Sequence, residues 1–439
     1  MYIGIDLGTT GCKTVLFGAD GRVLCEYNKE YELIFKDGFV EQDANDWWRL
    51  VHEGMKYVVT ESGVSKISGI SVSTQGISFV PVDEKGNTLY NAISWLDMRA
   101  EKECDELCAL HGHEKVFNIT GKHCLCDYSL PKIRWFADNR SDVLSNTWKL
   151  LFPLDYLNLK LCGRPVADYT IAGGTMLYDI HQKIWHPELL EFARISEDVL
   201  PEVLPMGTDI GCLLPEVANE CGIVGDCRVY LGGQDQKLAA IGAGICDDTC
   251  TVSFGTATAI SRLGKAIEFD ENSSVTLFRF DDKEYISEVA LMTTGAALRW
   301  LTRTLYGGIS YKEMDTLAAM SEPGANGVSF QSDLSVGGVI SGITLSTSAA
   351  DIVYALYEGV SKDIADAVNQ LGGAKVLKVF GGGAKSEIWC SILARVSGLT
   401  VEILSLPETA SLGAAILASG GKIEPAAVKK QITPYDNCY

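Results

Sequence analysis

The residue best suited to chemistry is Asp235, which lies in the stretch GGQDQ, directly after Gln234 and before Gln236. A carboxylate can accept the proton of a hydroxyl group, and phosphoryl transfer to a hydroxyl needs such a base. Histidine is the more usual base, but all six histidines lie at or before residue 186. An aspartate after glycine is also a common turn residue or helix cap, so both interpretations stay open. As a base, Asp235 would follow a sharp glycine turn beside the ligand, with the glutamines orienting the hydroxyl.

A short hairpin near the N-terminus carries residues suited to holding phosphate. In DLGTTGCK, Asp6 ends a strand, Thr9 and Thr10 offer hydroxyl groups, and Lys13 adds a positive charge. The backbone N–H groups of such a turn can bind phosphate oxygens, and the carboxylate can hold Mg²⁺ through water. A tight β-turn without a ligand is the alternative for this hairpin taken alone.

Two further glycine turns extend the pattern. SFGTAT contains Gly255 and Thr256, and FGGGAKSE places three glycines between an apolar strand and a helix. Glycines there let a flat adenine lie against the backbone, and a helix N-terminus favours anions. The chain contains neither a G-x-x-x-x-G-K-[ST] loop nor a G-x-G-x-x-G motif after a strand, so nucleotide binding requires another architecture.

Alternating strands and helices must position these turns. The opening residues predict an antiparallel meander, and CTVSFGTATAISRLGK predicts a second one. Apolar spacing after Asp46, the predicted cap, indicates a helix, and ISGISVST indicates a buried strand. Later segments predict two amphipathic helices and a strand–turn–helix unit. We therefore predict an α/β fold with two lobes, residues 1–238 and 239–439, and a ligand cleft between them.

Composition narrows the classes of protein. With 439 residues, 47% of them hydrophobic and 21% charged, the chain is expected to fold into packed domains. Its net charge of −20 argues against nucleic-acid and anionic-lipid partners, and the absence of a signal segment or long apolar run predicts a cytoplasmic protein. The fourteen cysteines are expected to be reduced. Whether the cysteines and histidines of residues 104–126 bind a metal is left open, because they match no familiar zinc spacing.

The ordered motifs resemble those of one family. The stretches GIDLGTTGCK, EQDANDWW, WLDMR, YTIAGGTMLYDI, GGQDQ, SFGTAT, GGGAKSEIW and ETASLGAAILA are similar, in this order, to the FGGY family of carbohydrate kinases over residues 2–420. The resemblance implies two ribonuclease-H-like lobes of the actin-like ATPase type, with ATP, Mg²⁺ and a sugar in the cleft. It implies that Asp235 is the general base and that Asp6 belongs to the magnesium site. The residues it implies for the nucleotide are Thr9, Thr10, Lys13, Gly255, Thr256, Gly295, Gly382, Gly383 and Ser386.

The acceptor pocket departs from the best-known members. Xylulose kinases of the family typically show Gln-Met-His-Gly where this chain has Gln75, Gly76, Ile77 and Ser78, and the Arg-Glu pair of glycerol kinases is absent too. The pattern is closer to erythritol kinases and other branches. Asp97 and Arg99 either contact substrate or form an ion pair with each other. The residues predicted to contact substrate are Gln75, Gly76, Trp95, Asp97, Arg99, Asp127 and Gln236.

These features together predict an ATP- and Mg²⁺-dependent kinase for a small sugar, with a ketopentose such as xylulose as the first choice of acceptor. Erythritol, glycerol or another polyol is the alternative acceptor. A nucleotide-dependent sugar sensor without catalysis is the alternative of another class. The predicted partner is a small sugar or polyol, and a homodimer is left open.

Overall fold

A six-stranded sheet forms the core of the N-terminal half of the chain. The computed structural model describes residues 1–334 and 337–435. Strands β1 to β3 form an antiparallel meander, and β6 and β15 add to it in parallel, so the order is β14-β15-β6-β1-β2-β3. The strands are β1 (Tyr2–Leu7), β2 (Gly11–Phe17), β3 (Val23–Glu30), β6 (Gly69–Thr74), β14 (Asp209–Cys212) and β15 (Arg228–Gln234).

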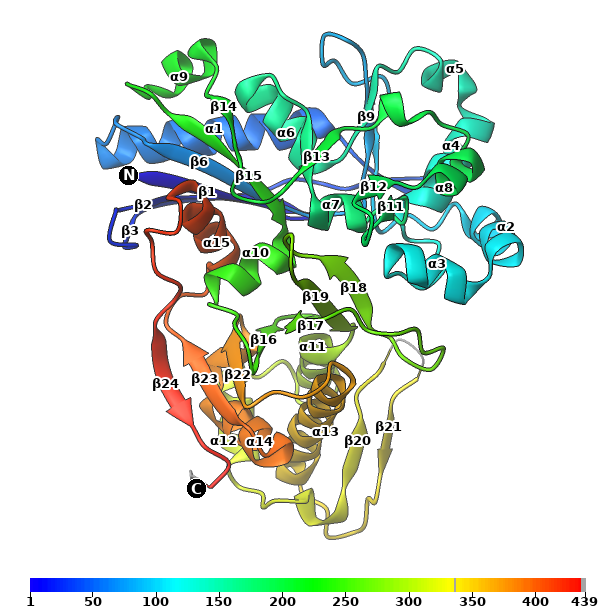
Figure 1. Ribbon diagram of the computed structural model, residues 1–439. Coiled ribbons are helices and arrows are strands. Elements are labelled where there is room, and N and C mark those ends of the chain that lie inside the picture. The colour runs from blue at the N-terminus through cyan, green and yellow to red at the C-terminus, as the bar shows by residue number, and fades with distance from the viewer. Residues whose placement is uncertain (335–336, 436–439) are drawn as a thin grey trace.

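A seven-stranded sheet in the C-terminal half repeats this arrangement and lies below the first in Figure 1. An antiparallel meander of β16, β17 and β19 is again followed by two parallel strands, β22 and β23. The repeated order is the ribonuclease-H-like topology, which confirms the predicted α/β fold with two related lobes. The strands are β16 (Thr249–Phe254), β17 (Thr258–Gly264), β18 (Thr276–Arg279), β19 (Tyr285–Leu291), β22 (Val376–Phe380), β23 (Thr400–Leu404) and β24 (Val428–Ile432).

Helix α1 (Ala44–Ser62) packs on the first sheet, where it contacts β2 and β3. Its apolar residues repeat at helical spacing and are buried, as the sequence predicts. The cap is Asp43 rather than Asp46, because the Asp43 side chain accepts the backbone N–H of Asn45. Asp46 lies in the first turn instead. The corresponding helices of the second lobe are α11 (Thr294–Leu305), α12 (Tyr311–Ala318), α13 (Ala349–Gln370) and α14 (Glu387–Ser397).

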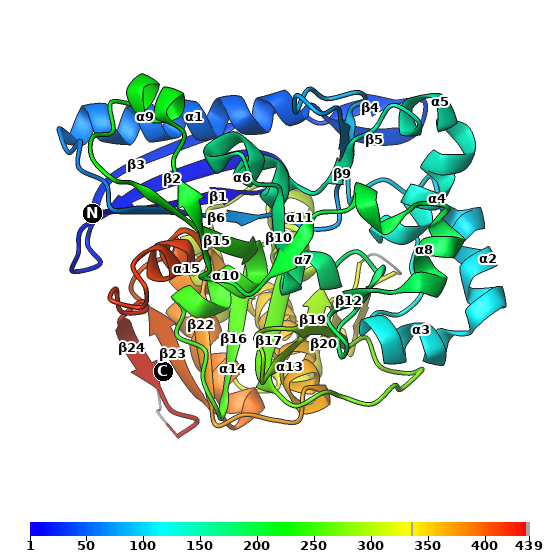
Figure 2. The same cartoon turned by 45° about the horizontal axis from the view of Figure 1, so that its top comes forward.

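Two short helices, α10 (Asp235–Gly242) and α15 (Thr409–Ala418), pack against each other between the two sheets, as both views show (Figures 1 and 2). Glycines let them approach closely: a Cβ on Gly242 would lie 1.9 Å from the carbonyl oxygen of Thr409. A Cβ on Gly413 would lie 1.9 Å from that of Leu238. The predicted lobe boundary after residue 238 falls inside α10, so the division into 1–238 and 239–439 remains a proposal.

A long insertion between β6 and β15 builds the remainder of the first lobe, including the α2 to α5 region at the edge of the molecule (Figure 2). Among the described residues, no helix is both long enough and apolar enough to cross a membrane. The helices of the insertion are α2 (Glu101–His111), α3 (His113–Thr120), α4 (Ser129–Asn139), α5 (Ser141–Leu144), α6 (Pro153–Cys162), α7 (Tyr169–Gly173), α8 (Pro187–Ala193) and α9 (Pro215–Cys221). The minor strands of the chain are β4 (Ile34–Lys36), β5 (Phe39–Gln42), β7 (Val80–Val82), β8 (Ala92–Ile93), β9 (Lys149–Leu151), β10 (Val166–Asp168), β11 (Tyr178–Asp179), β12 (Ile184–Trp185), β13 (Glu202–Leu204), β20 (Ser329–Gln331) and β21 (Val339–Ser341).

Candidate active site

Asp235 is the first residue of α10 and directly follows strand β15. The two glycines before it lie in the strand, so the prediction that they form a sharp turn beside the ligand is wrong. Gly232 instead allows β15 to pair with β6, because a Cβ there would lie only 1.7 Å from the carbonyl oxygen of Val72. The carboxylate accepts the backbone N–H of Gln236 at 2.7 Å. The strand end and the helix start thus hold Asp235 at the junction of the two lobes.

The carboxylates of Asp235 and Asp6 face a common cavity of about 290 Å³, which Lys13 and Gln236 also line. Burial, together with the neighbouring charge of Asp6, raises the pKa of Asp235 to about 7. Burial also raises the pKa of Asp6, although the hydroxyl of Ser73 donates to its Oδ1 at 2.7 Å and opposes the shift. At neutral pH, Asp235 therefore titrates where a general base is most effective.

The predicted phosphate hairpin lies beside this cavity. Asp6, Thr9, Thr10 and Lys13 line an adjoining cavity of about 270 Å³. The Lys13 ammonium is paired with Glu408 at 2.7 Å, so a bound phosphate would compete with this carboxylate. The carboxylates of Asp6, Asp235 and Glu408 line the junction, and carboxylate oxygens are ligands that suit Mg²⁺, so the predicted magnesium site at Asp6 fits the residues present.

A cavity of about 760 Å³ lies in the second lobe and has the size of a small-ligand site. Gly295 brings α11 against the β16–β17 hairpin, where a Cβ would lie 2.3 Å from the carbonyl oxygen of Gly255. The rings of Tyr357 and Trp389 stack with centroids 4.3 Å apart and form an aromatic wall. Six residues predicted for the nucleotide line this one cavity: Gly255, Thr256, Gly295, Gly382, Gly383 and Ser386.

Sequence reasoning missed several polar residues of the same cavity. Lys312 and Asp315 lie three residues apart on α12, and Arg299 lies on α11, where its guanidinium donates to Thr256 Oγ1 at 2.8 Å. Asp315 accepts hydrogen bonds from the hydroxyls of Ser386 and Tyr357, both at 2.7 Å. The i, i+3 spacing on an amphipathic helix was the available signal, but surface helices show it commonly.

Gly382 offers a test of the nucleotide cavity without disturbing the fold. Its backbone is in the ordinary right-handed helical region, and an added Cβ would meet no atom within 4 Å. We expect Gly382→Leu to weaken ADP binding about tenfold or more, because the side chain would enter ligand space. Titration calorimetry measures the change, and Gly382→Ala is the matched smaller substitution. A leucine variant with unchanged ADP affinity and melting temperature would show that the nucleotide does not approach this turn.

On the acceptor side, Gln75 is buried in an amide network beneath the hairpin. Its Nε2 donates to Gln42 Oε1 at 3.0 Å, and the Gln42 amide donates to the carbonyl oxygen of Thr9 at 2.8 Å. Gln75 is only 2% exposed. These contacts favour a role in positioning the turn at Thr9 over direct contact with a sugar.

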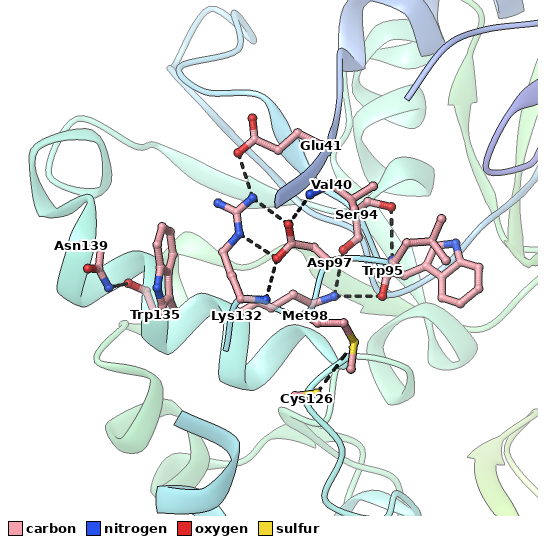
Figure 3. Close-up of polar contacts among 12 residues, drawn as sticks. Val40, Glu41, Ser94, Trp95, Asp97, Met98, Cys126, Lys132, Trp135 and Asn139 are labelled. Carbon is pink, nitrogen blue, oxygen red and sulfur yellow. Dashed lines mark hydrogen bonds and ion pairs between the residues drawn. The ribbon is translucent and has the colours of Figure 1, made fainter. Parts of the chain in front are cut away.

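Asp97 and Arg99 adopt the ion-pair alternative. Each carboxylate oxygen of Asp97 accepts a hydrogen bond from the guanidinium, at 2.7 and 2.8 Å, and Oδ2 also accepts the backbone N–H of Val40 at 2.6 Å. The guanidinium donates to Glu41 as well, at 2.9 Å. Figure 3 shows Asp97 between Val40, Glu41 and the chain at Trp95. The buried network favours the ion-pair alternative, because it occupies both Asp97 oxygens and two nitrogens of Arg99. Arg99 Nη1 is buried without a hydrogen-bond partner among the described residues, so a substrate contact by Arg99 stays a prediction.

Two of the remaining predicted contacts, Trp95 and Gly76, lie against Thr9 and Gln234. The Trp95 indole donates to Thr9 Oγ1 at 2.8 Å, and a Cβ on Gly76 would lie 3.2 Å from Gln234 Cγ. Ile77 follows at φ 71°, a strained conformation for a β-branched residue and one that clusters at functional sites.

Two buried oxygens on this side, Gln234 Oε1 and Asp127 Oδ1, have no hydrogen-bond partner among the described residues. Burial raises the pKa of Asp127. Unpaired buried acceptors are costly, and a polyhydroxylated ligand would satisfy them.

A nucleotide-sized cavity that opens beside a carboxylate-lined lobe junction is the arrangement of two-lobed, nucleotide-dependent kinases. Models of the FGGY family of carbohydrate kinases match residues 1–242 with the N-terminal domain and residues 250–420 with the C-terminal domain. The chain therefore belongs to this family. It is a sugar phosphotransferase that uses ATP with Mg²⁺.

Individual relatives agree with the family. A xylulose kinase from Bacillus subtilis is 30% identical, with 95% of this chain and 88% of the relative covered. A xylulose kinase from Staphylococcus xylosus is 28% identical, over 96% of this chain and 90% of the relative. The crystal structure of ligand-bound xylulose kinase from Lactobacillus acidophilus has a TM-score of 0.92 at 24% identity and covers 99% of this chain and 93% of that chain. At this level of identity, the structural similarity shows that the two proteins share a fold.

Proposed function

We propose that this kinase transfers the γ-phosphoryl group of ATP to a primary hydroxyl of a ketopentose such as xylulose, with Asp235 as the base. The observation that supports this most directly is the position of Asp235. It lies at the lobe junction in a cavity shared with Asp6, and its pKa is raised to about 7. Xylulose is the first choice because the relatives described above are xylulose kinases.

The chemistry assigned to each residue follows from this position. As the sugar oxygen bonds to the γ-phosphorus and the bond to the bridging oxygen of ADP breaks, Asp235 takes the hydroxyl proton. Asp6 would hold Mg²⁺ at the junction, and the ion would neutralise charge on the phosphate oxygens. The hydroxyl of Thr9 accepts from Trp95 and keeps its own proton for a phosphate oxygen. Gln234 and Asp127 offer their unpaired oxygens to sugar hydroxyls.

One observation favours acceptors other than xylulose: the residues after Gln75 differ from those typical of xylulose kinases. Gly76, Ile77 and Ser78 stand where xylulose kinases typically have Met-His-Gly, and Gly76 packs so closely against Gln234 that a Cβ there would lie 3.2 Å from Gln234 Cγ. Erythritol, glycerol and related polyols are therefore the second candidates. A sugar sensor without catalysis is disfavoured, because a sensor has no use for a base with a pKa near 7. The cytoplasm, where ATP is available, is the proposed compartment, and a homodimer stays a prediction for size-exclusion chromatography.

Sugar-dependent ADP release tests the proposal. We expect xylulose to stimulate ADP release strongly over the rate without sugar, because closure around the acceptor excludes water from the phosphoryl group. The panel should contain pentuloses, hexuloses, tetritols and glycerol at equal concentration, with ADP measured by a coupled assay. Stimulation by erythritol or glycerol alone would replace xylulose as the acceptor. Nucleotide binding without stimulation by any member would favour the sensor.

A further inference from the structure

A second cluster of reactive side chains lies away from the lobe junction, in the α2–α3 region of the insertion. The sulfur atoms of Cys108 and Cys124 and a ring nitrogen of His113 all lie within 4.8 Å of one another. Cys124 is buried, Cys108 is partly buried and His113 is exposed, so the cluster sits just below the surface. Two thiols and an imidazole at this separation are ligands that suit a soft divalent cation.

A glycine reversal brings these residues together. Helix α2 ends at His111, Gly112 has φ 78° and ψ 148°, and α3 starts at once with His113. This backbone conformation is accessible almost only to glycine, and it turns α3 back against α2. His113 consequently faces the last turn of the helix that carries Cys108. The segment after α3 then returns Cys124 to the same place.

Cys104 supplies a fourth candidate ligand. It lies one helical turn before Cys108, on the same face of α2, and is only 6% exposed. Cys104 is not one of the three residues whose ligand atoms all lie within 4.8 Å of one another.

The other candidate ligands of the segment make separate contacts. His111 lies 3.8 Å from a carboxylate oxygen of Glu188, and its ring packs edge-on against Phe192. The His123 ring packs against Phe117 and Phe269. Cys126 contacts the sulfur of Met98 at 3.8 Å. The ligand atoms that lie close together therefore come from one imidazole and two thiols, with Cys104 as a nearby third thiol on α2.

We propose that this cluster is a structural zinc site, formed by Cys104, Cys108, His113 and Cys124. Tetrahedral zinc with Zn–S bonds of about 2.3 Å places its sulfur ligands about 3.8 Å apart. For Cys108, His113 and Cys124 the observed separations need a contraction of about 1 Å, which rotation of the side chains can supply. Cys104 lies outside this group of three, so its sulfur would have to turn toward the cation to complete the site. The spacing C-x₃-C-x₄-H-x₁₀-C is not that of a zinc finger. The chain reversal at Gly112 brings residues with this spacing close enough to bind one ion.

The site would stabilise a segment that contacts both lobes. Before Cys124, the Lys122 ammonium donates to the carbonyl oxygen of Leu277 and lies 3.4 Å from the centre of the Phe278 ring, both in β18 of the second sheet. After Cys124, the chain reaches Asp127, whose buried oxygen is proposed to bind the sugar. Zinc would thus hold the segment that joins the acceptor pocket to the second lobe.

Metal analysis of the full chain tests the proposal. The protein should be purified with thiol reductant and without a polyhistidine tag, then analysed by plasma mass spectrometry before and after incubation with zinc. We expect about one zinc ion per chain, retained through gel filtration. Co²⁺ in place of zinc should give thiolate charge-transfer absorption in the near ultraviolet and the visible bands of a tetrahedral ion.

Variants separate this site from adventitious binding. Cys108→Ser and Cys124→Ser should each lose the zinc and the cobalt thiolate band, whereas Cys246→Ser, at an exposed thiol elsewhere, should keep both. If the serine variants fold poorly, His113→Ala at the exposed position serves instead and should weaken zinc retention against a competing chelator. Wild-type protein that holds no zinc after reconstitution would overturn the proposal. So would a Cys108–Cys124 disulfide in protein purified with reductant.

Discussion

Asp235→Asn should lower kcat for sugar phosphorylation by about 10²–10⁴-fold, the usual contribution of a positioned general base. The amide keeps the size of the side chain but cannot take the hydroxyl proton. Steady-state kinetics with the preferred sugar measures the loss, and calorimetry with ADP should show nucleotide affinity close to wild type. Asp248→Asn, at a surface carboxylate paired with Lys375, is the matched control and should keep full activity. Unchanged turnover in Asp235→Asn would remove Asp235 as the base.

The same carboxylate should determine the pH profile. Because its pKa is raised to about 7, Asp235 is increasingly protonated below that pH, and kcat/KM should fall on the acid side. Stability should change in the opposite sense. The folded protein holds the Asp235 proton more tightly than the unfolded chain, so this residue costs stability as pH rises from about 4 to about 7. Asp235→Asn should therefore melt at a higher temperature than wild type at pH 8, with a difference that shrinks toward pH 4.

Gly413→Ala should destabilise the protein by about 3 kcal/mol or more, at or beyond the upper end of ordinary overpacking. The new Cβ would lie 1.9 Å from the carbonyl oxygen of Leu238, and backbone on both sides leaves no side chain to move aside. Because α10 also carries Asp235, separation of α10 and α15 should reduce turnover in whatever protein still folds. Urea denaturation measures the loss of stability.

Gly264→Ala is the control for this substitution. Its Cβ would approach only the flexible end of Arg262, at 3.3 Å, so it should leave the denaturation midpoint nearly unchanged. Equal midpoints for Gly413→Ala and wild type would contradict close packing of the two helices.

The sequence by itself was sufficient for features whose chemistry is local. A turn such as GTT after a strand, or GGG before a helix, shows its backbone geometry in its own residues, and the ordered motifs then indicated the family. The nucleotide residues around Gly255 and Gly382 were predicted together for this reason and line one cavity. The repeated meander likewise followed from strand periodicity.

Tertiary structure decided the features that depend on residues distant along the chain. Gly232 was interpreted as a turn residue because its sequence neighbours do not show that Val72 of another strand lies against it. The pairing of Asp97 and Arg99 was open until Val40 and Glu41 completed the network. Lys312 and Asp315 gave no distinctive local signal before Ser386 was placed beside them.

The cysteine and histidine segment, residues 104–126, shows most clearly what the sequence could predict and what only the tertiary structure decided. Its composition was visible in the sequence, where a metal site was left open because the spacing matched no zinc motif. The reversal at Gly112 and the return of Cys124 gather ligands from two helices and a loop. The spacing of residues in the sequence predicts which side chains lie close together only within a regular helix or strand. Residues from two helices and a loop are brought together by the tertiary structure.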